Sequence, residues 1–310
     1  MRSVLDLKNK SLEKTITDQA LVNRALGAYV GLAVGDALGA TVEFMTPAEI
    51  KEHYGVHRDI VGGGWLKLKK GKVTDDTTMS LAMGRAIIAT GAIEAVSIAE
   101  AFSEWMSSQP VDIGHTVRRG IVHFRLNETT EMPTNEYDAG NGACMRTLPI
   151  ALATLGSTPE QIQRASRIQA HITHNNPLSD AGTECIIHMI QCTILGGSMT
   201  ELRVMADNLV EEHQHFMFTN RRCENPSGFI VDTLQAVFQS LFNCSGFENS
   251  MVDVVNRGGD ADTTGAILGM IAGAYYGLDA IPDKWRNNLD HQTLDECTSQ
   301  AIGLLKLASY

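Results

Sequence analysis

The chain has 310 residues and a formal net charge of −11 at neutral pH, and 44% of its residues are hydrophobic and 20% charged. This composition is typical of a globular protein with a core large enough for one big domain. The negative charge argues against general affinity for nucleic acid and for anionic membrane surfaces. Polar residues interrupt the N-terminus and no apolar stretch is long enough to span a bilayer, so we expect neither a signal peptide nor direct membrane insertion.

Helical periodicity dominates the chain. Apolar side chains recur at helical spacing from about residue 18 to 39, where alanines and glycines would permit close helix packing. Only the segment 62–71 alternates like a strand, which predicts a small hairpin. The further helical patterns run over 78–91, 94–108, 114–126, 142–155, 159–172, 178–196, 199–214, 227–243, 248–256, 263–277 and 293–307. Because no alternation of strands and helices appears, the sequence predicts a single all-α domain.

Two carboxylates stand at or just beyond the end of the first helical segment. Asp36 lies among small residues that suit close packing, so we expect it to be near-buried and to need a partner, such as a cation or a residue that binds one. Glu43 could reach the same pocket, although its spacing alone favours an exposed loop glutamate.

Two acidic clusters, 74–78 and 258–264, each place paired aspartates beside threonines where a helix begins. The oxygens of these side chains suit Mg²⁺, Mn²⁺ or Ca²⁺ rather than zinc or copper. If the fold brings the clusters together, they could hold a pair of cations that orient a substrate and activate water for hydrolysis. Both residue types are also favoured helix N-caps, but a cap needs one residue, whereas each cluster contains four or five.

A glycine-rich turn, Gly140-Asn141-Gly142, directly precedes a helical pattern. Its backbone N–H groups could bind a phosphate with help from the helix dipole, although such residues alone usually form an ordinary turn. His171 and His174 fall at the end of another helical pattern, where histidine commonly stabilises the helix C-terminus. Six scattered cysteines without a C-x-x-C spacing favour free thiols in a reducing cytoplasm.

Several of these segments occur together, and in the same order, in the ADP-ribosylglycohydrolases, which the chain resembles from about residue 23 onward. They are 31–43, 74–77, 140–146, 172–175 and 256–263. The segments 54–57, 62–68 and 110–114 resemble more specifically the branch of this family from nitrogen-fixing bacteria. The resemblance therefore predicts an ADP-ribosylglycohydrolase domain over residues 21–310, preceded by an N-terminal extension over residues 1–20.

This resemblance implies an orthogonal all-α bundle with two divalent cations in a cleft. Mn²⁺ is the first expectation for these cations and Mg²⁺ the second. The cations would be held by Thr74, Asp75, Asp76, Asp260, Asp262 and Thr263. Asp262 would bridge them, and Asp36 would support the ligands from behind. Gly140, Asn141 and Gly142 would cradle a diphosphate beside His174.

The proton carrier implied by the resemblance is either Glu43 or Asp112, and the sequence does not decide between them. A further question is Asp138, because an unpaired carboxylate is unwelcome beside a diphosphate unless it points outward.

The resemblance also implies a reaction, the removal of ADP-ribose from an arginine of the nitrogenase iron protein. It implies control by a PII signalling protein and recruitment to the membrane through a partner; we otherwise expect a cytoplasmic monomer. Two alternatives stay open. One is a hydrolase of another linkage, such as ADP-ribosyl-serine or free ADP-ribose conjugates. The other is a metal-binding relative without catalysis, against which the intact clusters and Glu43 argue.

Overall fold

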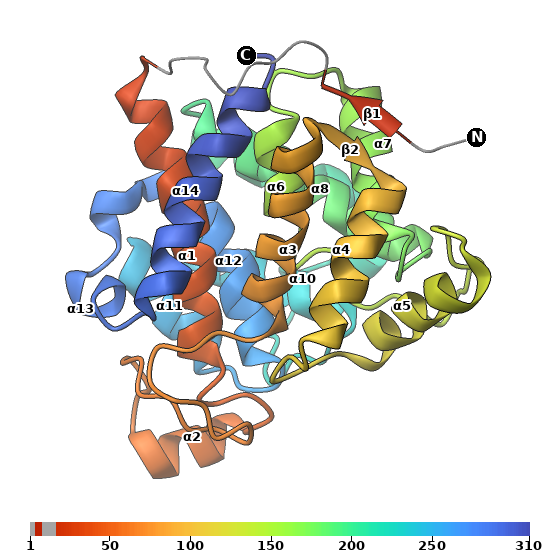
Figure 1. Ribbon diagram of the computed structural model, residues 1–310. Helices are drawn as coiled ribbons and strands as arrows, with labels where there is room; N and C mark the ends of the chain where they lie inside the picture. Colours follow the sequence, from red (N-terminus) through yellow and green to blue (C-terminus); the bar gives the residue numbers. More distant parts are fainter. Residues whose placement is uncertain (1–3, 8–16) are drawn as a thin grey trace.

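The structure is a computed structural model that describes residues 4–7 and 17–310, and within this part of the chain the regular secondary structure is almost entirely helical (Figure 1). This confirms the predicted all-α class. The α-helices are α1 (Gln19–Gly39), α2 (Pro47–Tyr54), α3 (Asp75–Thr90), α4 (Ala95–Ser107), α5 (His115–Asn127), α6 (Leu148–Ala153), α7 (Pro159–Ala170), α8 (Pro177–Ile194), α9 (Met199–Glu212), α10 (Ile230–Asn243), α11 (Phe247–Val255), α12 (Ala261–Tyr276), α13 (Asp283–Arg286) and α14 (His291–Leu307). Two 3-10 helices, η1 (Gln214–Phe216) and η2 (Leu278–Ala280), and two strands, β1 (Val4–Asp6) and β2 (Ala92–Glu94), complete the described elements.

Helices α1 and α12 form the centre of the bundle and approach more closely than ordinary side chains permit. A Cβ atom added at Gly27, Gly31, Gly35 or Gly39 would lie 2.1–2.2 Å from a backbone oxygen of α12. These glycines recur every fourth residue and so share one helix face. Because the two helices run antiparallel, the end of α1 lies beside the start of α12. The close packing predicted from the small residues is confirmed.

The remaining helices surround this pair and bury it. Helix α14 packs along α1, as Figure 1 shows, while α8, α10 and α11 pack against α12. Helix α3 contacts α1, α12, α4 and α14. The start of α3 therefore meets the end of α1 and the start of α12, which brings three helix ends to one place.

The structure differs from the sequence-based predictions at three places. The helix predicted over 142–155 is confined to α6, because residues 141–146 form turns and Pro149 suits only the first turn of a helix. Helix α2 was missed, although Thr46 and Glu49 form a capping box that its sequence could have indicated. The predicted hairpin is reduced to a single antiparallel bridge between Gly63 and Leu68.

Part of the predicted N-terminal extension joins the body of the protein. β1 pairs antiparallel with β2, and Leu5 and Leu7 are buried. Residues 1–3 and 8–16 lie outside the described residues. Helix α1 starts at Gln19, close to the expected domain start at residue 21, and the boundary itself stays a prediction. No helix of the described chain combines the length and the apolar character needed to cross a membrane.

Candidate active site

The two acidic clusters lie at the meeting point of three helix ends. Asp75 and Asp76 are the first residues of α3, while Asp260 caps α12 and Asp262 follows in its first turn. All are buried except Asp260, which is half-buried. Helix N-termini carry partial positive charge and unpaired N–H groups, so both starts favour carboxylates. The local sequence thus explains why each cluster can be buried.

Asp36 fastens the start of α3 to the end of α1. Its carboxylate accepts hydrogen bonds from the Thr74 backbone N–H at 2.9 and 3.1 Å. It also accepts from the Thr77 backbone N–H at 3.1 Å and from the Thr77 hydroxyl at 2.5 Å. Because the Thr74 side chain makes no capping bond, Asp36 performs that role from a different helix. The partners that its burial requires are thus residues of the first acidic cluster.

The fold brings the two clusters together. The Thr263 hydroxyl donates to Asp76 Oδ2 at 3.4 Å, and the Thr74 hydroxyl donates to the same oxygen at 3.2 Å. Glu43, Asp260 and Asp262 each place a carboxylate oxygen within 4.8 Å of the others. Glu43 is only 4% exposed, so the interpretation of it as an exposed loop residue is wrong.

Crowding and burial raise the pKa of these carboxyls. Burial is the main cause that raises the pKa of Glu43 to about 8. The hydrogen bond from Trp65 lowers this pKa, and the negative charge of Asp260 raises it further. Burial and then the charge of Asp112 raise the pKa of Asp75 to about 7. The pKa values of Asp76 and Asp262 rise well above the usual range, mainly through burial. A cluster of carboxyls that resists ionisation in this way is one that a bound cation would stabilise.

The residues present fit a hard divalent cation. Asp76 Oδ1 is buried and has no hydrogen-bond partner within the described chain. Such an orphaned carboxylate oxygen is rare unless an ion or water satisfies it. The surrounding donors are oxygens of aspartate, glutamate and threonine, which are the ligands that Mg²⁺, Mn²⁺ and Ca²⁺ prefer.

A cleft of about 260 Å³ opens beside the clusters and is lined from both sides by predicted site residues, including Glu43, Asp75, Asp112, Gly140, His174 and Asp260. Thr74 and Asp76, which are 0% and 1% exposed, lie behind its surface. Asp112 is half-buried in the loop before α5 and accepts a hydrogen bond from the Ile113 N–H at 2.7 Å. In the same loop, the Gly114 N–H points to Asp75 Oδ2 at 3.4 Å.

The glycine-rich turn and His174 form the opposite side of the cleft. A Cβ atom on Gly140 would lie 3.0 Å from His174 Nε2, and one on Gly142 would lie 2.7 Å from His174 Cε1. Only glycine therefore lets the imidazole ring sit against the turn. Asn141 is engaged elsewhere, because its Nδ2 donates to Asp260 Oδ2 at 2.6 Å and to the Thr233 hydroxyl at 2.9 Å. Asn141 thus links the turn to the acidic side.

Asp138 is not an unpaired charge beside this turn. Its Oδ2 forms an ion pair with Arg119 and accepts a hydrogen bond from Asn135 Nδ2 at 2.7 Å. The carboxylate is therefore neutralised locally, which answers the question that the sequence raised.

One contact to Glu43 was missed by sequence reasoning. The Trp65 indole N–H donates to Glu43 Oε2 at 2.6 Å, while its ring is half exposed and lies 5.4 Å from the ring of Phe44. Phe44 has a φ of 61°, an uncommon value for a bulky residue, and its N–H donates to the Gly259 carbonyl at 2.7 Å. No local pattern joins Trp65 to Glu43, because the contact arises only when the 62–71 segment folds over the end of α1.

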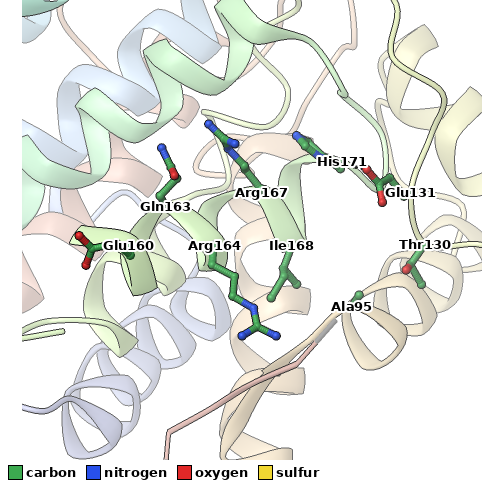
Figure 2. A pocket seen from close by; sticks show the side chains of 9 residues that line it. All are labelled: Ala95, Thr130, Glu131, Glu160, Gln163, Arg164, Arg167, Ile168 and His171. Atoms are coloured by element: carbon green, nitrogen blue, oxygen red, sulfur yellow. Dashed lines mark ion pairs between the residues drawn. The ribbon is translucent and has the colours of Figure 1, made fainter. Parts of the chain in front are cut away.

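A second pocket, shown in Figure 2, lies on α7 and contains none of the predicted site residues. Two of its basic groups are paired: Arg167 binds Glu184, and His171 contacts Asp180 and Glu131, while Arg164 also lines the pocket. His171 is the C-cap residue of α7, in agreement with the helix-end role expected for it. This pocket therefore lacks the cluster of buried aspartates that distinguishes the acidic cleft.

Comparisons with known proteins agree with this geometry. The family model described as ADP-ribosylglycohydrolase matches residues 17–309. The chain is 49% identical to "ADP-ribosyl-[dinitrogen reductase] glycohydrolase" of Rhodospirillum rubrum, over 94% of this chain and 99% of that protein. It is 30% identical to "ADP-ribosylarginine hydrolase Tri1" of Serratia proteamaculans, over 89% of this chain and 78% of that protein.

Among solved structures, the chain resembles one titled "ADP-ribosylglycohydrolase-related protein complex", with a TM-score of 0.81 and 30% identity, covering 93% of this chain and 99% of that one. The acidic cleft, the fold and these matches lead to one conclusion: the chain belongs to the ADP-ribosylglycohydrolase family.

Proposed function

We propose that this protein hydrolyses the N-glycosidic bond that joins ADP-ribose to an arginine side chain of another protein. The observation that carries the proposal is the union of two acidic clusters and Glu43 at one cleft, in a member of this family. The names of the R. rubrum and S. proteamaculans relatives support arginine as the linkage.

Two divalent cations, with Mn²⁺ preferred to Mg²⁺, would be held by the oxygens of the two clusters. The ligands would be Thr74, Asp75, Asp76, Asp260, Asp262 and Thr263, with Asp262 between the two ions. When bound, the cations would supply positive charge for the ribose hydroxyls and for water. The orphaned Asp76 Oδ1 and the raised pKa values of the carboxyls support this proposal.

Residues of the cleft would carry out the proton transfer that hydrolysis requires. As the bond from ribose C1 to nitrogen breaks, its electron pair goes to the guanidinium group, which leaves as neutral guanidine. Water bonds to C1 and gives up a proton to a carboxylate, which passes that proton to the departing guanidine, so that arginine is released as its guanidinium and the carboxylate is restored. Glu43 and Asp112 both line the cleft, and either could accept that proton. Trp65 holds the Glu43 carboxylate by its hydrogen bond, whereas Asp112 lies nearer to solvent on its own loop.

The diphosphate of ADP-ribose would lie on the glycine side of the cleft. The backbone N–H groups of Gly140 and Gly142 make no hydrogen bond within the described chain, so both are available as donors. Asn141 would act through its bond to Asp260, and His174 would contact the diphosphate across the two glycines.

The substrate protein would be the nitrogenase iron protein. The relative with 49% identity carries dinitrogen reductase in its name, and the match spans nearly its whole length. Regulation by a PII protein and membrane recruitment through a partner stay predictions.

The test offers the purified protein, with Mn²⁺ present, two substrates: ADP-ribosylated nitrogenase iron protein and a serine-linked ADP-ribosyl protein. We expect release of ADP-ribose from the arginine linkage and little from the serine linkage. Preference for serine would overturn the arginine assignment but leave the metal site standing. No release from either would favour the non-catalytic alternative, provided that the protein is folded and loaded with metal.

A further inference from the structure

Arg146 is a fully buried cation directly behind the glycine side of the cleft. Its side chain is 0% exposed, and within the described chain its hydrogen bonds go to neutral oxygens of Gln169 and Thr173 rather than to a carboxylate. Its Nε donates to Gln169 Oε1 at 2.9 Å, and its guanidinium lies 4.4 Å from the centre of the Phe102 ring. A buried charge without a carboxylate partner is costly, so its place needs an explanation.

The guanidinium is connected to His174 through one hydroxyl. Arg146 Nη2 donates to Thr173 Oγ1 at 2.8 Å, and Thr173 Oγ1 lies 2.7 Å from His174 Nδ1. Thr173 and His174 are 1% and 2% exposed, so this chain of contacts is shielded from water.

The contacts determine where the imidazole proton lies. A guanidinium can only donate, so Thr173 Oγ1 is the acceptor of the Arg146 bond. The threonine hydroxyl still carries one hydrogen, and within the described chain the only acceptor in reach is His174 Nδ1. A buried hydroxyl hydrogen without an acceptor would be unfavourable, so Nδ1 accepts and is unprotonated. The neutral ring therefore carries its hydrogen on Nε2.

That Nε2–H group faces the cleft. His174 lines it, and Nε2 lies against Gly140 and Gly142, whose added Cβ atoms would sit 3.0 and 3.1 Å away. Nε2 makes no hydrogen bond within the described residues, so its donor is directed at whatever occupies the cleft. Burial, with the charges of Arg146 and Arg119, also lowers the pKa of His174 to about 3, which agrees with a neutral ring.

We propose that Arg146 and Thr173 are positioning residues that fix His174 as a neutral Nε2–H donor to the diphosphate of ADP-ribose. Arg146 also supplies, from behind the ring, a positive charge that the anionic ligand can partner. The ligand in this statement rests on the proposed function, whereas the tautomer does not.

The tautomer is tested first, without any ligand. ¹⁵N-histidine-labelled protein is studied by ¹H–¹⁵N correlation of the ring nitrogens, with His174 assigned by its absence in His174→Gln. We expect a protonated Nε2 and an unprotonated Nδ1 at His174 from pH 6 to 8, and the same pattern in Thr173→Ser. We expect Thr173→Val to lose the single tautomer. A protonated Nδ1 in the unmodified protein would overturn the proposal.

The role in binding is tested by calorimetry with free ADP-ribose and Mn²⁺. Thr173→Val should weaken binding about tenfold, as expected for a lost hydrogen bond to a charged group, and Thr173→Ser should restore it. Thr193→Val is the matched control, because Thr193, like Thr173, is a buried threonine with a hydrogen-bonded hydroxyl. Its partners are backbone carbonyls of α8, and it does not line the cleft. It should leave binding unchanged.

The outcomes separate the two proposals. If the unmodified protein does not bind ADP-ribose, the proposed function fails, while the NMR measurement still decides the tautomer. If it binds ADP-ribose and Thr173→Val binds equally well, Thr173 does not act through His174 and the positioning proposal is wrong.

Discussion

The two sides of the cleft are built in different ways. The acidic wall (Glu43, Asp75, Asp76, Asp260 and Asp262) consists mainly of neighbouring residues at helix starts. The glycine wall (Gly140, Gly142 and His174, backed by Thr173 and Arg146) depends on one buried chain of contacts behind it. The acidic wall concentrates negative charge that a cation would offset, whereas the glycine wall has a buried positive charge that an anion would offset. Changes to the first should therefore affect metal and turnover, and changes to the second should affect ADP-ribose binding.

The largest expected effect comes from Asp262→Ala. Because we propose that Asp262 lies between both ions, its loss should lower metal content and reduce the rate about a hundredfold or more, as several kcal/mol of charge stabilisation disappear. Metal analysis and turnover on ADP-ribosyl-arginine check this, with Asp75→Ala expected to lose metal as well. Asp207→Ala, which removes an exposed partner of Arg203, is the control. Full retention of both ions in Asp262→Ala would refute its bridging role.

Glu43→Gln and Asp112→Asn should keep the metals and slow turnover. A true general acid or base is worth about 10²-fold or more. Single-turnover rates and metal content are measured for both variants. If one of these variants turns over at the parental rate, the residue replaced in it is not the proton carrier. If Glu43→Gln loses metal instead, its closeness to Asp260 and Asp262 would make it a ligand.

Arg146→Met should distinguish the two walls. The substitution removes the buried charge and the donor to Thr173 while keeping an apolar side chain of similar length. We expect the dissociation constant of ADP-ribose to rise about tenfold, with metal content unchanged. Calorimetry and metal analysis on one preparation give both values. Metal loss with unaltered ADP-ribose affinity would contradict the division of roles.

The last expected effect concerns stability rather than activity, and it is a pH dependence due to His174. Because the pKa of His174 is lowered to about 3, the folded protein leaves it neutral at pH 5, while the unfolded chain protonates it near its usual pKa of about 6.5. Lowering the pH from 7 to 5 therefore costs about 2 kcal/mol of unfolding free energy from this residue alone. His174→Gln should lose that share of the dependence. Urea unfolding of both proteins at the two pH values measures it, and an equal slope in both would show that His174 titrates normally.

The acidic wall could be predicted from the sequence because its chemistry is local. Asp75 and Asp76 are adjacent, Asp260 and Asp262 are nearly so, and both pairs lie where a helix begins. The alanines and glycines of α1 likewise predicted a close helix contact, because their side chains are small.

The rest could not be predicted because it depends on packing between distant segments. Asp36 caps a different helix, and Trp65 reaches Glu43 from another loop. Arg146 looked like one more residue of a predicted helix, but residues 141–146 form turns that place it beneath Thr173. The spacing of Glu43 even favoured exposure, whereas the approach of α12 and the 62–71 segment buries it.

The most direct test of this division of the cleft into a metal-binding side and a diphosphate-binding side is a crystal structure of the protein with Mn²⁺ and ADP-ribose. We predict an anomalous Mn²⁺ signal at the acidic wall and the diphosphate against Gly140 and Gly142, with His174 Nε2 within hydrogen-bond distance of a phosphate oxygen. A diphosphate bound instead at the arginines of α7 (Figure 2), with His174 Nε2 unpaired, would contradict it.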